Sequence, residues 1–189
     1  MALHLRPPGR RTAKHRLSPD GTTPVESTHF TWDGPTLTEQ STTTPDSPQS
    51  LTLTWDHQGL TPLTQTERKL TTTDLAFASQ RVIDERFFNI VTDLVGAPTE
   101  LVSESGEVAW RSRPTLWGTT TWNTDATAYT PLRFPGQYFD SESLLHYNFH
   151  RYYDPGSGRY MSQDPLGLEP GPDPVGTCTI RVPGSTRSA

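Results

Sequence analysis

The sequence predicts a mainly β fold built from antiparallel hairpins, followed by an irregular C-terminal tail rich in proline and glycine. Its 189 residues include 30 threonines and 18 aromatic residues but only 2 methionines, and β-branched and aromatic residues favour strands. The 18 prolines and 14 glycines supply turns. Only 31% of the residues are hydrophobic, and this length suits about one domain. This composition excludes a helix bundle, a coiled coil and collagen, and the single cysteine excludes a disulfide framework.

Residues 1–80 contain short runs rich in threonine and aromatic side chains, each closed by a turn, and such runs predict strands. One begins at Arg10 and ends at residues 18–21 (SPDG), HFTW ends at residues 33–35 (DGP), and LTLTW ends at residues 56–59 (DHQG). This loose repetition suggests β-repeats. The Ser/Thr/Pro-rich stretch at 41–50 is expected to be a loop or linker.

From Arg81 the pattern predicts further hairpins. The expected segments are a strand at 87–92, a turn at 93–96, a strand at 99–102, a turn at 103–106, a strand at 108–113 and an extended run at 115–122. Trp110, Trp117 and Trp122 are then available to pack on neighbouring strands.

A last strand is predicted to open at Leu144 and to run to Arg151. Strict alternation would place Leu145, Tyr147 and Phe149 on one face, with His146, Asn148 and His150 on the other.

Charge and hydropathy limit the classes of partner and the cellular locations that the sequence predicts. No apolar stretch reaches the ~20 residues of a membrane-spanning helix, and no export signal is visible at the N-terminus. Five basic residues precede the first acid, Asp20, and such a cluster suggests a nucleic-acid-binding arm or an ordinary solvated strand. The net charge of −5 leaves no second basic patch to grip a phosphate backbone, so we expect no nucleic-acid partner and assign no compartment.

The usual catalytic and metal-binding patterns are missing. The sequence contains no G-x-S-x-G, P-loop, G-x-G-x-x-G or deaminase signature. His146 and His150 would lie roughly 13 Å apart on a strand, too far to share a metal ion. Cys178 lacks a C-x-x-C partner and an environment that would lower its pKa. We therefore expect no metal and no cofactor.

The stretch from residue 133 to 168 contains FPGQY, YN, RYYDP, GRY and SQDPLGL, in this order and at close spacing. With these motifs it closely resembles the repeat-associated core of the Rhs/YD-repeat proteins. Residues 91–118 resemble the segment that precedes this core, and residues 7–14 resemble an altered YD repeat, so the resemblance covers about residues 1–176. The resemblance divides the chain into three units, which are degenerate YD-repeat strands at 1–80, the core at 81–168, and a spacer and tail at 169–189. The signature residues are Phe134, Pro135, Gly136, Gln137, Tyr138, Tyr147, Asn148, Arg151, Tyr152, Tyr153, Asp154, Pro155, Gly158, Arg159, Pro165, Gly167 and Leu168.

The residues around Asp154 can be interpreted without the resemblance. Asp154 and Pro155 start a turn, and Gly156 and Gly158 can take positive φ, so Tyr153 and Tyr160 should meet on paired strands. Arg151 and Arg159 are then expected to pair with carboxylates across the strands or to stack on tyrosines.

The resemblance implies a large hollow bacterial shell of β-hairpins that encloses a C-terminal cargo, often a toxin. Family members are typically exported or attached to the cell surface, so other shell segments or a secretion apparatus are the implied partners. In many relatives, two Asp-Pro-x-Gly-Leu motifs supply an aspartate dyad that cuts the cargo free, a chemistry that suits two carboxyls sharing one proton. Asp164 matches the first motif.

The tail departs from the family pattern. Asp173 begins a similar motif, but it lies only nine residues after Asp164 and lacks the closing leucine, so it is a weak surrogate. With suitable codons, the neighbouring reading frame of residues 177–189 encodes both segments that the family expects here, which suggests a frameshift. We therefore predict a truncated, non-enzymatic shell fragment without its toxin. The alternatives are a β-rich module that binds carbohydrate or a partner through exposed aromatic residues and, third, residual self-cleavage through Asp164.

Overall fold

The computed structural model describes residues 2–6, 10–45, 47–74 and 79–163, and these residues form strands and turns. The side chains of residues 2, 4–6, 72–74, 79 and 80 are not described. The fourteen strands are β1 (Ala2–Arg6), β2 (Arg10–Leu17), β3 (Pro24–Asp33), β4 (Thr36–Thr43), β5 (Gln49–Gln58), β6 (Thr61–Asp74), β7 (Ser79–Thr92), β8 (Pro98–Ser103), β9 (Val108–Pro114), β10 (Thr120–Trp122), β11 (Tyr138–Asp140), β12 (Leu145–Asn148), β13 (Arg151–Asp154) and β14 (Arg159–Tyr160).

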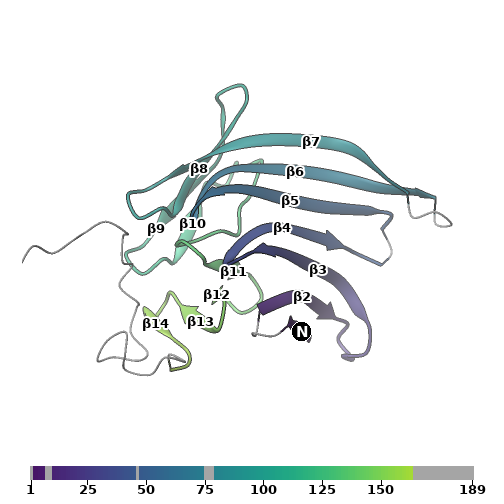
Figure 1. Cartoon of the computed structure of the whole chain (residues 1–189), viewed down its shortest axis with the longest axis horizontal. Helices are drawn as coiled ribbons and strands as arrows, with labels where there is room; N and C mark the ends of the chain where they lie inside the picture. Colours follow the sequence, from purple (N-terminus) through teal and green to yellow (C-terminus); the bar gives the residue numbers. More distant parts are fainter. Residues whose placement is uncertain (1, 7–9, 46, 75–78, 164–189) are drawn as a thin grey trace, which may run out of the picture.

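The first ten strands form one antiparallel sheet in which every strand pairs with its neighbour in sequence. Figure 1 shows this large sheet as a bent, twisted surface. Because directly paired residues share a face of a sheet, the register from Phe30 to Gln40 to Leu53 marks one row of the inner face. A second row joins Trp55, Gln65 and Phe88. The predicted antiparallel β fold is therefore confirmed for the described residues.

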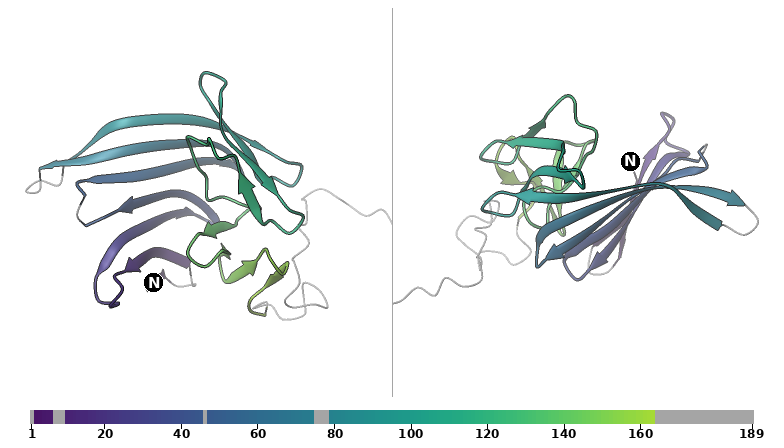
Figure 2. Two further views of the ribbon diagram at one scale, coloured as in Figure 1. Left: turned by 180° about the vertical axis from the view of Figure 1, so that it is seen from behind. Right: turned by 90° about the horizontal axis from the view of Figure 1, so that it is seen from above.

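The last four strands form a second sheet, in the order β11-β12-β13-β14. It lies against one end of the inner face of the large sheet, as the two views of Figure 2 show. At the opposite end of β6 and β7, residues 81–85 are all exposed. The small sheet therefore covers only part of the large one, and we call it the closing sheet.

The hydrophobic core lies between the two sheets. Trp55 and Trp110 are among its largest buried side chains, and Trp110 is fully buried, as its position in the sequence suggested. From the other side, Leu132, Tyr138 and Tyr147 complete the core. Threonines and other polar residues fill much of the rest of the large sheet. A chain with so few hydrophobic residues can therefore form long strands, because only the region between the two sheets has to be buried away from water.

The connection between β4 and β5 is shorter than the loop expected at 41–50. Ser41–Thr43 belong to β4, and Gln49 and Ser50 belong to β5. Threonine packs well on a pleated surface, so its strand preference prevails over the turn-like composition of this stretch. Residue 80 lies in β7, which pairs with β6 on one side and β8 on the other.

Two predicted strands are interrupted by turns. Residues 115–119 form a turn, closed by a 2.8 Å hydrogen bond from the Thr115 amide to the Thr119 carbonyl, so that only β10 remains of the extended run. The strand expected up to Arg151 ends at Asn148, because Phe149 takes a left-handed conformation (φ 54°) and forms a tight turn with His150. The predicted alternation of faces therefore holds only as far as Asn148.

Candidate functional site: the closing sheet and its contacts

The tyrosines of the core signature lie in the closing sheet, where they contribute to two aromatic rows. Tyr138 pairs with Tyr147, and Tyr147 pairs with Tyr152, so these three side chains share the face that meets the large sheet. Phe30 packs edge-on against Tyr138 at 5.2 Å between ring centroids, and Trp32 packs against Tyr147 at 6.0 Å. This row joins the closing sheet to the hydrophobic core.

The second row lies on the opposite face. Phe139, His146, Tyr153 and Tyr160 follow one another across the four strands, with ring centroids 5.4–5.8 Å apart. Tyr153 is fully buried, and its hydroxyl donates a 2.9 Å hydrogen bond to the carbonyl of Trp117. The adjacent tyrosines 152 and 153 therefore serve opposite faces of one strand, which gives a physical reason for the doubled tyrosine of the motif.

A cluster of four charged residues joins the start of the large sheet to the closing sheet. Arg11 Nη1 lies 2.5 Å from Asp140 Oδ2, and both side chains are completely buried. Lys14 Nζ lies 3.1 Å from Asp140 Oδ1 and 2.8 Å from Glu142 Oε1. The Arg11 amide also donates a 2.8 Å hydrogen bond to the Tyr147 hydroxyl. The residues of each pair are more than 120 positions apart in the sequence, so only the folded chain brings them together.

Aromatic rings surround the Arg11 guanidinium. Its central carbon lies 4.6 Å from the centroid of Phe30, 5.0 Å from Tyr138 and 4.3 Å from Tyr147, and such faces attract a cation. Burial acts to lower the pKa of Arg11, but the charge of Asp140, its hydrogen bond and smaller effects of Tyr152 and Tyr138 together outweigh burial, so the net pKa is raised. The guanidinium is therefore held in its charged form inside the protein.

The same burial and charges set the pKa values of two acidic groups nearby. Burial strongly raises the pKa of Tyr138, helped by the negative charge of Asp140. Partial burial acts to raise the pKa of Glu142, but hydrogen bonds and charge from Lys14 lower it overall. Tyr138 thus stays neutral and Glu142 stays ionised near neutral pH, as this cluster requires.

Phe134 and Pro135, just before the closing sheet, pack against two turns of the large sheet, and we call this pair of residues the wedge. A Cβ atom added at Gly118 would lie 2.8 Å from the Phe134 ring, and one added at Gly96 would lie 3.2 Å from Pro135. Both glycines also have positive φ, so a side chain there is disfavoured by the backbone conformation as well as by the close neighbour. The two turns lie in the segment that resembles the stretch preceding the core, which explains why the two sequence signatures occur together.

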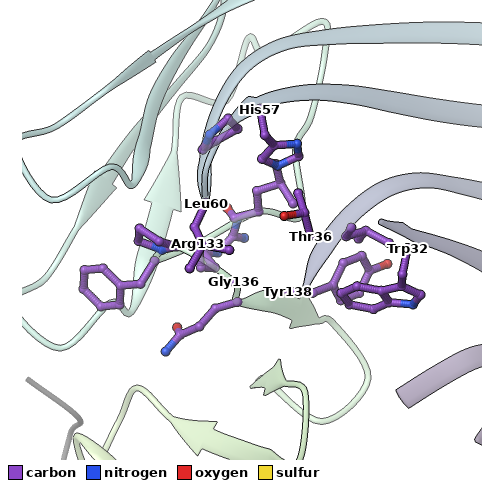
Figure 3. A pocket seen from close by; sticks show the side chains of 13 residues that line it. Trp32, Thr36, His57, Leu60, Arg133, Gly136 and Tyr138 are labelled. Atoms are coloured by element: carbon purple, nitrogen blue, oxygen red, sulfur yellow. The ribbon is translucent and has the colours of Figure 1, made fainter. Parts of the chain in front are cut away.

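Behind this wedge lies a small cavity between the closing sheet and the β5–β6 turn. Figure 3 shows Arg133 and Gly136 on one side of it, with His57 and Leu60 on the other. Its volume is about 20 Å³, which is room for roughly one water molecule. The cavity is therefore a packing gap and too small for an organic ligand.

The Asp154–Gly158 turn forms largely as the sequence predicts. Tyr153 pairs with Tyr160, and Gly158 has positive φ, whereas Gly156 does not. The Arg151 guanidinium stacks on the Tyr160 ring at 3.6 Å, the second of the two expected arrangements. Arg159 is exposed and lies opposite Asp154 in the strand register.

Two other chemical expectations concern metals and cleavage. Within the described ranges, no three His, Cys, Asp or Glu side chains lie close enough to hold a metal ion, and no helix has the length and apolar character to cross a bilayer. The proposed cleavage residues Asp164 and Asp173 lie outside the described residues, as do Pro165, Gly167, Leu168 and Cys178.

Sequence reasoning missed the cluster around Asp140. The one available signal was Asp140 itself, an acid that directly follows Tyr138 and Phe139 and that strand alternation places on the same face as Tyr138. Its basic partners were noticed only as part of an N-terminal group of positive charges, because their contact with residues of the core arises entirely from long-range packing.

Comparisons with known proteins agree with this architecture. A family model described as "RHS protein" matches residues 88–123. The chain is 47% identical over 102 residues to the double-stranded DNA deaminase toxin A of Burkholderia cenocepacia, and 48% identical over 83 residues to the toxin protein Tse5 of Pseudomonas aeruginosa. These matches cover 48% and 44% of this chain but only 7% and 6% of the relatives.

Among solved structures, a crystal structure of TcdB2-TccC3 matches with a TM-score of 0.67 and 19% identity, over 93% of this chain and 8% of the other. At this identity the likeness concerns the fold alone. Its extent across nearly the whole chain nevertheless shows that the large sheet and the closing sheet occur together in a much larger protein. The RHS segment, the two toxin relatives and the fold thus agree that this chain is similar to Rhs proteins.

Proposed function

We propose that this chain forms a section of an Rhs shell wall together with the sheet that closes against it, and that such a shell encloses a C-terminal cargo. The observation that carries the proposal is the arrangement of the two sheets. Ten strands follow one another in sequence order, as in a continuous wall, and the closing sheet is fixed to one end of it by a buried charge cluster.

The edges of the large sheet support this role. In the described part of the chain, β1 pairs only with β2, and β10 pairs only with β9. Unpaired edge strands present free amide and carbonyl groups to further strands. We infer that other shell segments are the partners of these edges, and that export through a secretion apparatus acts on the whole shell.

The proposed role is structural, without catalysis by this chain. The single remaining cleavage candidate is Asp164 with Asp173 as a surrogate partner. The test is the intact mass of the purified protein after prolonged incubation. A single unchanged mass supports the structural role, whereas a fragment that disappears in Asp164→Asn would show self-cleavage.

A chimera tests the wall function directly. Residues of this chain replace the matched 102-residue segment of the Burkholderia toxin, with its cargo made catalytically inactive, and protease resistance of the cargo is measured at pH 7.5. We expect the cargo to stay as well protected as in the unaltered toxin. A soluble chimera whose cargo is cut as fast as free cargo would refute the proposal.

No observation favours the alternative of an aromatic binding surface. Trp117 and Trp122 are half-exposed, but each already packs on its own neighbour: Trp117 lies against Gly158 and Trp122 against Tyr129. Most of the other described aromatic side chains are buried or partly buried. They contribute to packing and do not form the exposed row that a carbohydrate-binding face requires.

A further inference from the structure

Two histidines from different sheets flank the segment Arg133–Gln137, which carries the wedge. His146 of the closing sheet contacts it from one side, with its Nδ1 atom 2.8 Å from Gln137 Oε1. His57 of the large sheet lines the cavity on the other side, facing Arg133 and Gly136 (Figure 3). The segment that joins the two sheets is thus held between two side chains of the one residue type whose unperturbed pKa lies near neutral pH.

His146 lies in surroundings that oppose a positive charge. Its side chain is 1% exposed and packs between the rings of Phe139 and Tyr153. Burial, and then the positive charge of Arg133, lower its pKa to about 3, although Asp154 acts in the opposite direction. These are the charged and titratable groups that face it, so the ring stays neutral while the closing sheet is in place.

His57 is in a similar position on the large sheet. Its Nδ1 atom is buried and has no hydrogen-bond partner within the described part of the chain. Burial lowers its pKa, against the opposing effects of the Trp55 backbone and the Asp56 carboxylate. Across the cavity it faces Arg133, a buried cation, and Tyr138, which is neutral.

We propose that the Arg133–Gln137 segment is an acid-sensitive latch, which releases the closing sheet from the large sheet when His146 and His57 take up protons. Glutamine at position 137 acts through Oε1, an acceptor, so neutral His146 donates to it from Nδ1. A second proton would place a positive charge on His146 close to that of Arg133, and only Asp154 acts in the opposite direction among the groups that shift its pKa. His146 is covered on its own face by the β9–β10 turn of the large sheet, since a Cβ added at Gly118 would lie 3.4 Å from its ring. Separating the two sheets therefore exposes both rings to water and removes this cost.

The size and sign of the effect follow from proton binding. Above pH ~6.5, His146 is neutral in both the closed and the open state, so pH has no effect through it. Between pH ~6.5 and the pKa of about 3 that His146 has in the closed state, the open state binds a proton that the closed state does not bind. The open population should therefore rise about thirtyfold between pH 7.5 and pH 5 from this histidine alone. Glu142 and Asp154 have lowered pKa values and stay ionised in this window.

Amide hydrogen exchange measures this opening in the whole chain. Exchange of residues 138–154, corrected for the intrinsic effect of pH, is compared at pH 7.5 and pH 5. We expect the thirtyfold rise in the wild type and in His150→Gln, a control at an exposed histidine. In His146→Gln, which keeps a polar contact for Gln137 but binds no proton, the rise should fall to a few fold. An unchanged rise in this variant overturns the proposal.

A titration of the unmodified protein covers the case in which His146→Gln does not fold. The ring protons of the six histidines are followed by NMR from pH 8 to pH 5. We expect His146 to show no titration of its own while the sheet is closed; a midpoint near 6.5 in the closed state would refute the latch. Neither experiment involves a cargo, so a failure here is distinct from a failure of the shell-wall proposal, which is tested at pH 7.5.

Discussion

Replacing Asp140 with asparagine should strongly destabilise the contact between the two sheets. Asp140 is completely buried and neutralises Arg11, which is equally buried, as well as Lys14. Asparagine keeps the shape but removes the charge, and it leaves the Arg11 cation uncompensated. Breaking a buried pair by removing one partner costs about 3–5 kcal/mol. The aromatic rings around Arg11 recover only part of this, about 1–2 kcal/mol at most.

Urea denaturation at pH 7.5 measures this loss as a change in the free energy of unfolding. Glu142→Gln is the matched control in the same cluster, because Glu142 is 29% exposed and solvent screens its charge. We expect it to cost no more than about 1 kcal/mol. Arg68→Gln removes an exposed pair with Glu85 at the far end of the large sheet and should change stability by less than about 0.5 kcal/mol.

A cost below about 1 kcal/mol for Asp140→Asn would refute the reasoning, since that is the range of exposed ion pairs. The double variant Arg11→Met with Asp140→Leu provides a second check. Because the main cost is an isolated charge, removing both charges should cost less than Asp140→Asn alone. A double variant that loses the sum of the two single effects would mean that packing volume dominates.

The remaining predictions concern a glycine and a buried amide. Gly118→Ala should lower the free energy of unfolding by about 2–5 kcal/mol, because Gly118 has positive φ and a Cβ there would lie 2.8 Å from Phe134. Gly106→Ala, at similar φ but with open space around it, should cost only about 1–2 kcal/mol. Equal costs of the two variants in thermal denaturation would disprove the close packing of Phe134 on Gly118. Gln65→Leu leaves the indole N–H of Trp55 without its 2.8 Å acceptor and should cost about 1–3 kcal/mol, measured by urea denaturation, and a neutral result would show that the N–H finds another acceptor.

The course of the strands could largely be predicted from local sequence. Between Phe87 and Arg113, β8 and β9 lie within one residue of the predicted strands because their apolar runs and Gly turns agree with each other, whereas β7 already begins at Ser79. The errors occur where local preferences conflict. Threonines at 41–43 join β4 despite a turn-like neighbourhood, and Phe149 turns the chain although it is a typical strand residue. In both places, pairing with a neighbouring strand decides the backbone.

The sequence by itself determined that this protein is an antiparallel β protein with a segment that resembles the Rhs core, because turn residues, strand residues and the core motif are all local signals. Only the tertiary structure decided that Arg11 and Lys14 meet Asp140, that Phe134 fits over Gly118, and that His146 is buried and neutral. Each of these depends on how one sheet packs against the other. Such contacts join residues that lie up to 136 positions apart, and no pattern along a single strand encodes them.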